Sequence, residues 1–146
     1  MDPPRAVELG SLPTALGYLL RRAQVAVFAD FIASLEAVGL RPGQYGALIV
    51  IQCNPGLSQR ELCAALEIQE ANFVPMMNGL VRRRLAQRRP SPSDHRRHAL
   101  FLTARGASVL RRAHALQRAH EARLTARLGA AGRARLTQLL RELASL

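Results

Sequence analysis

The stretch that decides the fold is residues 57–106, which read LSQRELCAALEIQEANFVPMMNGLVRRRLAQRRPSPSDHRRHALFLTARG. Ser58 and Glu61 form a capping box, in which the hydroxyl and the carboxylate each satisfy a free backbone donor at a helix start. A second helix is predicted over residues 70–84, and Pro75 in its first turns is expected to bend it rather than break it. Two short helices joined by a tight turn are typical of helix-turn-helix proteins, whose second helix lies in the major groove of DNA.

The residues that follow predict an arginine-rich β-hairpin. Two short segments, Leu85-Ala86-Gln87-Arg88-Arg89 and Ala99-Leu100-Phe101-Leu102, lie on either side of a polar tip rich in proline and serine and predict the two strands. Between Val81 and Arg112 stand ten arginines and one carboxylate, Asp94, so this segment carries +9 of the net charge of +11. Charge of this density attracts polyanions, which makes nucleic acid the predicted partner. Membrane headgroups fit less well, because the prolines and serines keep the arginines off a single helix face.

A long helix is predicted before this segment. Apolar residues recur at steps of three and four from Leu12, and the periodicity runs up to Gly39. Val25, Phe28 and Ile32 widen the apolar stripe beyond what one core face needs, which predicts a second buried surface such as a dimer partner.

Further helices complete the expected order. Pro42 suits the first turn of a helix that ends at the breaker sequence of residues 54–56. After the hairpin, Thr103 is expected to cap a helix that runs to Gly129, and a last helix carries the leucines between residues 136 and 146.

The bulk composition is that of a helix-rich globular protein. The chain has 146 residues, of which 49% are hydrophobic and 4% aromatic, a length that suits one core. No apolar run approaches the ~18 residues of a membrane span, and the N-terminus lacks a leader pattern. We therefore expect a soluble, cytoplasmic protein with no membrane partner.

The cysteines and histidines do not indicate a disulfide framework, a reactive thiol or a metal site. Cys53 and Cys63 do not make a disulfide framework, and both fall within apolar helices, which predicts inert thiols. His95 and His98 have a loose metal-ligand spacing, but a strand would point them to opposite faces and no nearby cysteine completes the set. We predict no metal and no cofactor.

This order of elements resembles the MarR family of winged helix-turn-helix regulators over roughly residues 10–146. The resemblance rests on residues 39–45 (GLRPGQY), on residues 57–62 (LSQREL), and above all on Asp94-His95-Arg96 followed by Leu102-Thr103-Ala104-Arg105-Gly106. It implies a mainly α fold with a small β-hairpin wing and long N- and C-terminal dimerisation helices. One domain over 1–146 would hold a DNA-binding lobe at about 41–104 and dimerisation helices at about 11–39 and 105–146.

The resemblance also implies a function. Such proteins are dimers, typically repressors that release a pseudo-palindromic double-stranded operator when a small effector binds, often an aromatic acid or a related thioester. Arg96 would enter the minor groove with Asp94 orienting it, and Asn72 is the best candidate to pair with adenine. The implied DNA-binding residues are Ser58, Gln59, Glu70, Ala71, Asn72, Val74, Asn78, Arg82, Arg88, Arg89, Asp94, Arg96 and Arg97. An effector cavity between the first, second and fifth helices would use Tyr18, Arg22, Phe28, Tyr45 and His114.

Other functions remain open at this point. Ala71, Val74 and Pro75 depart from the family pattern, which usually has small hydroxyl or polar residues there. This departure favours a sequence-indifferent architectural DNA-binding protein, whose affinity would rest on phosphate contacts. A thiol-based redox-sensing regulator is a further alternative on the same fold. An enzyme is disfavoured, because the sequence has no paired carboxylates, no nucleophile with a placed histidine and no glycine-rich phosphate loop.

Overall fold

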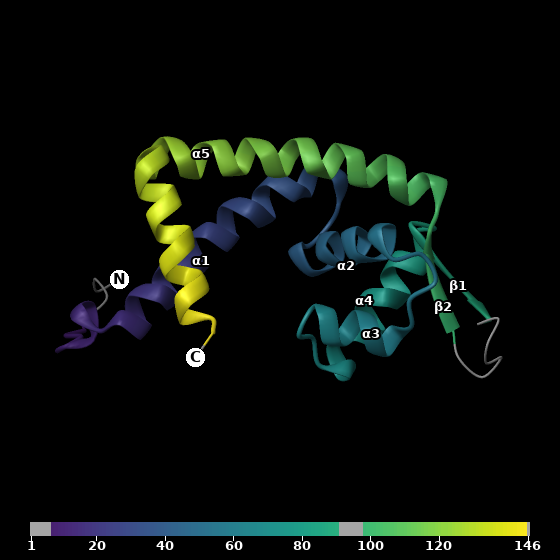
Figure 1. Ribbon diagram of the computed structural model, residues 1–146, viewed down its shortest axis with the longest axis horizontal. Helices are drawn as coiled ribbons and strands as arrows, with labels where there is room; N and C mark the ends of the chain where they lie inside the picture. The colour runs from purple at the N-terminus through teal and green to yellow at the C-terminus, as the bar shows by residue number, and fades with distance from the viewer. Residues whose placement is uncertain (1–6, 91–97, 146) are drawn as a thin grey trace, which may run out of the picture.

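The computed structural model describes residues 7–90 and 98–145. Its helices divide between a long stem and a lobe at one end of the stem (Figure 1). The stem consists of α1 (Leu16–Leu35) and α5 (Ala104–Leu143), with short 3₁₀ turns on either side of α1, η1 (Leu12–Thr14) and η2 (Glu36–Val38). The lobe consists of α2 (Pro42–Cys53), α3 (Gln59–Ala65), α4 (Glu70–Arg82) and the antiparallel hairpin of β1 (Ala86–Pro90) and β2 (His98–Leu102). The predicted fold class, mainly α with a β-hairpin, is confirmed.

The first helix is shorter than the periodicity predicted. Ala15 has an extended backbone, so η1 is separate from α1, and α-helical geometry ends at Leu35 rather than at Gly39. The remaining turn, η2, is a 3₁₀ turn of the kind that often tightens a helix end. Gly39 then ends the segment with φ of 62°, a left-handed conformation that costs glycine little because it has no Cβ.

The hydrophobic core lies in the lobe and where the lobe meets the stem. Side chains from α2, α3, α4 and β2 are fully buried together with Leu85, which precedes β1, and with one residue from each stem helix: Leu48, Ile51, Leu62, Phe73, Met77, Leu80, Leu85, Leu100, Leu35 and Leu110. Each side chain of this size contributes ~1.5–3 kcal/mol when it is fully buried. The lobe is therefore the part of the chain that this core holds rigid.

The far end of the stem has no such core. Gly129 is non-helical, with φ of 71° and ψ of 158°, and α5 bends there. This agrees with the helix end that was predicted at this glycine. Figure 1 shows the last part of α5 turning sharply away from the direction of the rest of the helix, at the end of the molecule opposite the hairpin. Leu136, Leu139, Leu140 and Leu143 in this part remain exposed.

A close joint connects the lobe to α5. The Thr103 hydroxyl accepts a hydrogen bond from Gly106 N at 2.9 Å, which caps α5 as predicted. The same hydroxyl donates to the Arg84 carbonyl oxygen at 2.6 Å, just after α4. A Cβ at Gly106 would lie 1.9 Å from the Leu85 carbonyl oxygen, so only glycine allows α5 to approach the lobe this closely. These contacts give a physical reason for the threonine and glycine of the LT-x-x-G pattern.

Candidate nucleic-acid interface

The helix-turn-helix unit is fixed by local hydrogen bonds at each end of α3. Ser58 accepts from Glu61 N at 3.2 Å and its own N–H donates to the Glu61 carboxylate at 2.7 Å, so the predicted capping box is confirmed. At the other end, Glu67 has φ of 52°, and Ile68 N donates to the Cys63 carbonyl oxygen at 3.0 Å. This is the Schellman arrangement, which ends α3 sharply and directs the chain into α4.

Helix α4 has one buried face and one exposed face. Phe73, Met77 and Leu80 point into the core. The opposite face, here called the reading face, is exposed and consists of Glu70, Ala71, Asn72, Val74, Pro75, Asn78 and Arg82. It holds every α4 residue that the resemblance assigned to DNA binding. Pro75 does not interrupt the helix, in agreement with the sequence-based expectation.

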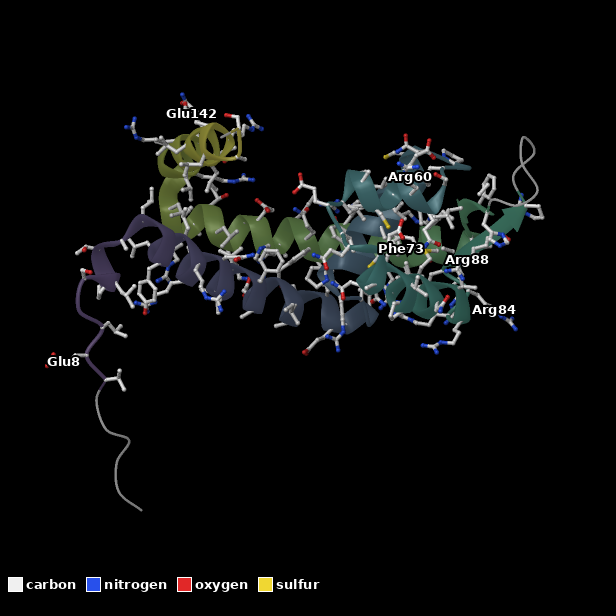
Figure 2. All side chains as sticks on the ribbon, turned by 90° about the horizontal axis from the view of Figure 1, so that it is seen from below. Glu8, Arg60, Phe73, Arg84, Arg88 and Glu142 are labelled. Carbon is white, nitrogen blue, oxygen red and sulfur yellow. The ribbon has the colours of Figure 1, made fainter. Side chains whose placement is uncertain are left out.

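The hairpin lies against α4 and carries its arginines next to the reading face. Arg88 on β1 donates from Nη1 to Asn78 Oδ1 at 2.9 Å, which joins the strand to the helix. The Arg89 guanidinium lies over the Phe101 ring of β2, 4.8 Å from the ring centroid. Figure 2 shows Arg60, Phe73, Arg84 and Arg88 at one end of the molecule, far from Glu8 and Glu142. Of the described arginines between Val81 and Arg112, those before β2 therefore lie in the lobe, and Arg105, Arg111 and Arg112 lie at the start of α5.

A further strand-like segment supports β2. Gly56 N donates to the Leu100 carbonyl oxygen at 2.8 Å, and Leu100 N donates to the Leu57 carbonyl oxygen at 2.9 Å. Ser58 therefore lies both at the start of α3 and beside β2, where it forms a β-bridge with Ala99. The predicted tip residues Asp94, Arg96 and Arg97 lie outside the described residues.

Arg83 has a structural role that the sequence did not reveal. It follows α4, and its guanidinium donates to the Gly39 carbonyl oxygen at 2.5 Å and to the Val38 carbonyl oxygen at 3.1 Å. The end of α4 is thereby bonded to the end of the α1–η2 segment. Within the run 82–84, Arg82 and Arg84 are exposed while Arg83 is half-buried. No local pattern distinguishes the middle arginine, because its partners are more than 40 residues away.

The predicted effector residues are only partly brought together. The Tyr45 hydroxyl and His114 Nδ1 share a hydrogen bond of 2.9 Å, and burial raises the pKa of Tyr45 above its ordinary value. Phe31, which was not predicted, packs edge-on against Tyr45 with the ring centroids 5.7 Å apart. Tyr18 lies 13 residues before Phe31 on α1, a rise of about 20 Å along the helix. Tyr18 therefore lies well away from the Tyr45–His114 pair.

Arg22 and Phe28 are not part of this cluster either. Both residues are exposed on α1. Among the described residues, no hydrogen bond or ring contact joins either of them to Tyr45 or His114.

A polar network joins α1 to α5 beside these rings. Asp30 Oδ2 accepts from His120 Nδ1 at 2.5 Å and from Arg123 Nη2 at 2.7 Å, and Arg123 also donates to the Ser34 hydroxyl at 2.6 Å. His120 is 4% exposed and stacks on Phe31. The hydrogen bond from Arg123, and secondly that from His120, lowers the pKa of Asp30 below its ordinary value. Sequence periodicity gave no signal for this network.

One expectation about the cysteines is wrong. Cys63 is buried, and burial raises the pKa of its thiol, as predicted for an inert cysteine. Cys53, however, is exposed, because it lies in the last turn of α2 on the side away from the core.

Neither a metal site nor a single membrane-spanning helix is found in the described part of the chain. There, no three histidine, cysteine, aspartate or glutamate side chains gather to hold a metal ion. Over the same residues no single helix is long and apolar enough to cross a membrane, although α1 with η2 and α2, which meet at 68°, reach that length and composition together.

Known proteins are similar to this chain in both sequence and fold. A family model described as the MarR family matches residues 38–97. The transcriptional repressor CouR, solved on a 23-mer DNA duplex, is 41% identical with a TM-score of 0.89, over 96% of this chain and 99% of that one. CouR bound to p-coumaroyl-CoA is 39% identical with the same TM-score, over 95% and 98% of the two chains.

Curated relatives give the same assignment. A proposed transcriptional regulatory protein for the hcr operon of Thauera aromatica is 38% identical over 92% of this chain and 81% of its own length. The transcriptional repressor Rv2887 of Mycobacterium tuberculosis is 35% identical over 89% of this chain and 94% of its own length. These are regulators of transcription and not enzymes. By sequence, fold and the geometry of its helix-turn-helix unit, the chain belongs to the MarR family of transcriptional regulators.

Proposed function

We propose that this chain is a dimeric repressor that binds a pseudo-palindromic operator and is released by a small aromatic acid or its thioester. The observation that carries the proposal is the Asn78–Arg88 hydrogen bond, which holds an arginine-bearing strand beside the exposed reading face of α4. A two-fold symmetric dimer presents two such faces to successive major grooves, about 10 base pairs apart. A regulator of this kind works on the chromosome, so we assign the protein to the cytoplasm and assign it no catalytic activity.

The DNA-binding roles follow from position and chemistry. The reading face enters the major groove, with Asn72 in the first turn of α4. Arg82 and Arg89 neutralise phosphates, and the Phe101 ring holds the Arg89 guanidinium in place. At the hairpin tip we retain Arg96 in the minor groove with Asp94 orienting it, and Arg97 on a phosphate, on the strength of the family resemblance. Ser58 and Gln59 place the start of α3 at the duplex backbone.

The stem supplies the dimer interface. Its exposed apolar side chains, at 37–60% exposure, include Leu16, Val25, Phe28, Ile32, Leu136, Leu139 and Leu143. Large apolar side chains exposed in such number along one part of a protein mark an interaction site. We take the chain as one domain, with a DNA-binding lobe at about 41–104 and dimerisation helices at about 11–39 and 105–146. The continuous core from Leu35 to Leu110 supports a single folding unit.

The effector site is proposed around Tyr45 and His114, where α1, α2 and α5 meet. Their hydrogen bond and the neighbouring Phe31 ring offer polar groups beside an aromatic wall, which suits a phenolic or carboxylate ligand with a planar ring. The relatives support this chemistry, because CouR is solved with p-coumaroyl-CoA and Rv2887 with p-aminosalicylic acid. Tyr18, Arg22 and Phe28 keep a proposed role only at the outer part of such a site.

The first experiment measures fluorescence anisotropy on a labelled duplex from the region upstream of the chain's own gene. A scrambled duplex is the control, at low and at physiological salt. We expect the natural duplex to bind at least ~10³-fold more tightly than the scrambled one. Equal binding to both duplexes, lost together as salt rises, would replace the repressor by an architectural DNA-binding protein.

Variants then assign the roles. Arg96→Ala should weaken operator binding by about 1–3 kcal/mol while the dimer stays intact, and Arg127→Ala, an exposed arginine far along α5, should leave it unchanged. For the effector site, p-coumaroyl-CoA and p-aminosalicylate are titrated onto the protein–DNA complex. Tyr45→Phe should retain DNA binding and require more ligand for release. Release that is identical in Tyr45→Phe and in the wild type would move the effector site elsewhere.

A further inference from the structure

The first turns of the reading face contain an apolar patch between the polar residues Glu70, Asn72 and Asn78. Ala71, Val74 and Pro75 are exposed on α4, and Val74 keeps 43% of its surface accessible. An exposed valine beside an exposed proline forms a small, rigid apolar surface, since proline fixes its own φ and valine has one strongly preferred rotamer in a helix. These are the positions at which the sequence departs from the family pattern, so hydroxyl-based reading of bases is absent there.

The polar residue one turn further on is already engaged. Asn78 lies three and four residues after Pro75 and Val74, so the three side chains are neighbours on the helix surface. Its Oδ1 accepts from Arg88 at 2.9 Å. This bond uses one of the two lone pairs of the amide oxygen and ties the side chain to β1, so Asn78 is not free to turn its amide towards a base edge. The same hydrogen bond places a guanidinium beside the apolar surface.

The occupant of this surface must therefore combine negative charge with an exposed apolar group. Duplex DNA does so in the major groove, where the phosphates flank the base edges and the C5-methyl of thymine is the apolar group that those edges present. We propose that Val74, flanked by Ala71 and Pro75, reads a thymine methyl group in each half-site. This inference rests on the proposed operator binding and assigns part of its sequence specificity to an apolar contact.

The test removes only the methyl group. Duplexes selected from a random library by the full-length wild-type protein define the operator, and each thymine is then replaced in turn by uracil, which keeps every hydrogen-bonding group. Burying one methyl group is worth ~0.8 kcal/mol, or about four-fold in affinity. We expect one symmetry-related thymine position to show this loss, and about sixteen-fold when both half-sites carry uracil.

Val74→Ala identifies the protein side of the contact. The variant should bind the thymine operator less tightly than the wild type does, and it should bind the uracil operator as tightly as the wild type does. The loss of affinity from Val74→Ala and the loss from uracil therefore do not add. Val7→Ala, at an exposed valine next to Glu8 at the far end of the molecule (Figure 2), should retain the full uracil effect. Full uracil sensitivity in Val74→Ala, or affinity that no uracil changes, would overturn the inference. Selection of no sequence at all would instead refute operator binding itself.

Discussion

Replacing Gly106 with alanine tests the joint between the lobe and α5. Gly106 lies in the first turn of α5, where an added Cβ would be 1.9 Å from the Leu85 carbonyl oxygen and 2.8 Å from Leu102 Cδ1. Cβ atoms in real proteins essentially never approach another heavy atom closer than 3.0 Å. Because the nearer contact is to backbone, no side-chain rotation relieves it. The start of α5 must therefore move away from Leu85 by about 1 Å or more.

That movement has a cost that the contacts allow us to estimate. Thr103 N donates to the Leu85 carbonyl oxygen at 3.1 Å, and the Thr103 hydroxyl donates to the Arg84 carbonyl oxygen at 2.6 Å, both across the joint. Losing these two hydrogen bonds costs about 1 kcal/mol each. Overpacking adds about 1–3 kcal/mol, and the better helix propensity of alanine returns about 1 kcal/mol. Gly106→Ala should lower the free energy of unfolding by about 2–4 kcal/mol.

Urea denaturation followed by circular dichroism measures this difference, at one fixed protein concentration because the protein is proposed to be a dimer. The matched control is Gly132→Ala in the same helix, where the nearest atom to an added Cβ is Leu128 Cβ at 3.7 Å. The control should be unchanged or more stable by up to about 1 kcal/mol. If Gly106→Ala were as stable as the wild type, steric exclusion would not be the reason for glycine at this position.

Three further substitutions or labels probe other contacts. Asp30→Asn removes a carboxylate whose pKa is lowered by folding. The ionised carboxylate therefore stabilises the folded state fully at pH values above its ordinary pKa of 3.8, and this stabilisation is lost as the pH falls through the lowered pKa. Urea denaturation near neutral pH and at about pH 3 should therefore show a smaller decrease in the free energy of unfolding for the variant than for the wild type. Arg83→Met removes two hydrogen bonds to carbonyls at the end of the α1–η2 segment and should cost about 1.5–3 kcal/mol, against less than about 0.5 kcal/mol for exposed Arg82→Met. A thiol-reactive dye at neutral pH should label Cys53 rapidly and Cys63 only on unfolding; rapid labelling of both would contradict the burial of Cys63.

Local signals in the sequence predicted most of the lobe. The capping box at Ser58, Pro42 in a first helical turn and the threonine cap at Thr103 each act within a few residues, so they can be read directly and all are confirmed. The same holds for Gly129, whose left-handed backbone bends α5 where a helix end was predicted. The predicted limits of α1 were wrong, because a 3₁₀ turn continues the apolar periodicity of an α-helix for a few residues.

Contacts between elements that are distant in the sequence could not be predicted from these local signals. Arg83 looks identical to its two neighbours, yet it alone of the three donates to carbonyls more than 40 residues away. The effector cluster shows the same limit, since periodicity placed Tyr18 and Phe31 on one helix without saying which of them meets Tyr45. The aromatic contact is made by Phe31, which was not predicted. Exposure of Cys53 likewise depends on which side of α2 the lobe covers.

These distant contacts bear directly on how an effector would act on DNA binding. Helix α4 is held at its C-terminal end by Arg83, which bonds it to the α1–η2 segment, and by the hydrogen bond of Thr103 to Arg84, which bonds it to α5. Asn78 and Arg88 then join α4 to β1, so the reading face and the hairpin move together. The proposed effector site lies between the same two stem helices and α2. A ligand that changes the angle between α1 and α5 must therefore change the spacing of the two reading faces in a dimer, and an operator with fixed half-site spacing binds only one of the two arrangements.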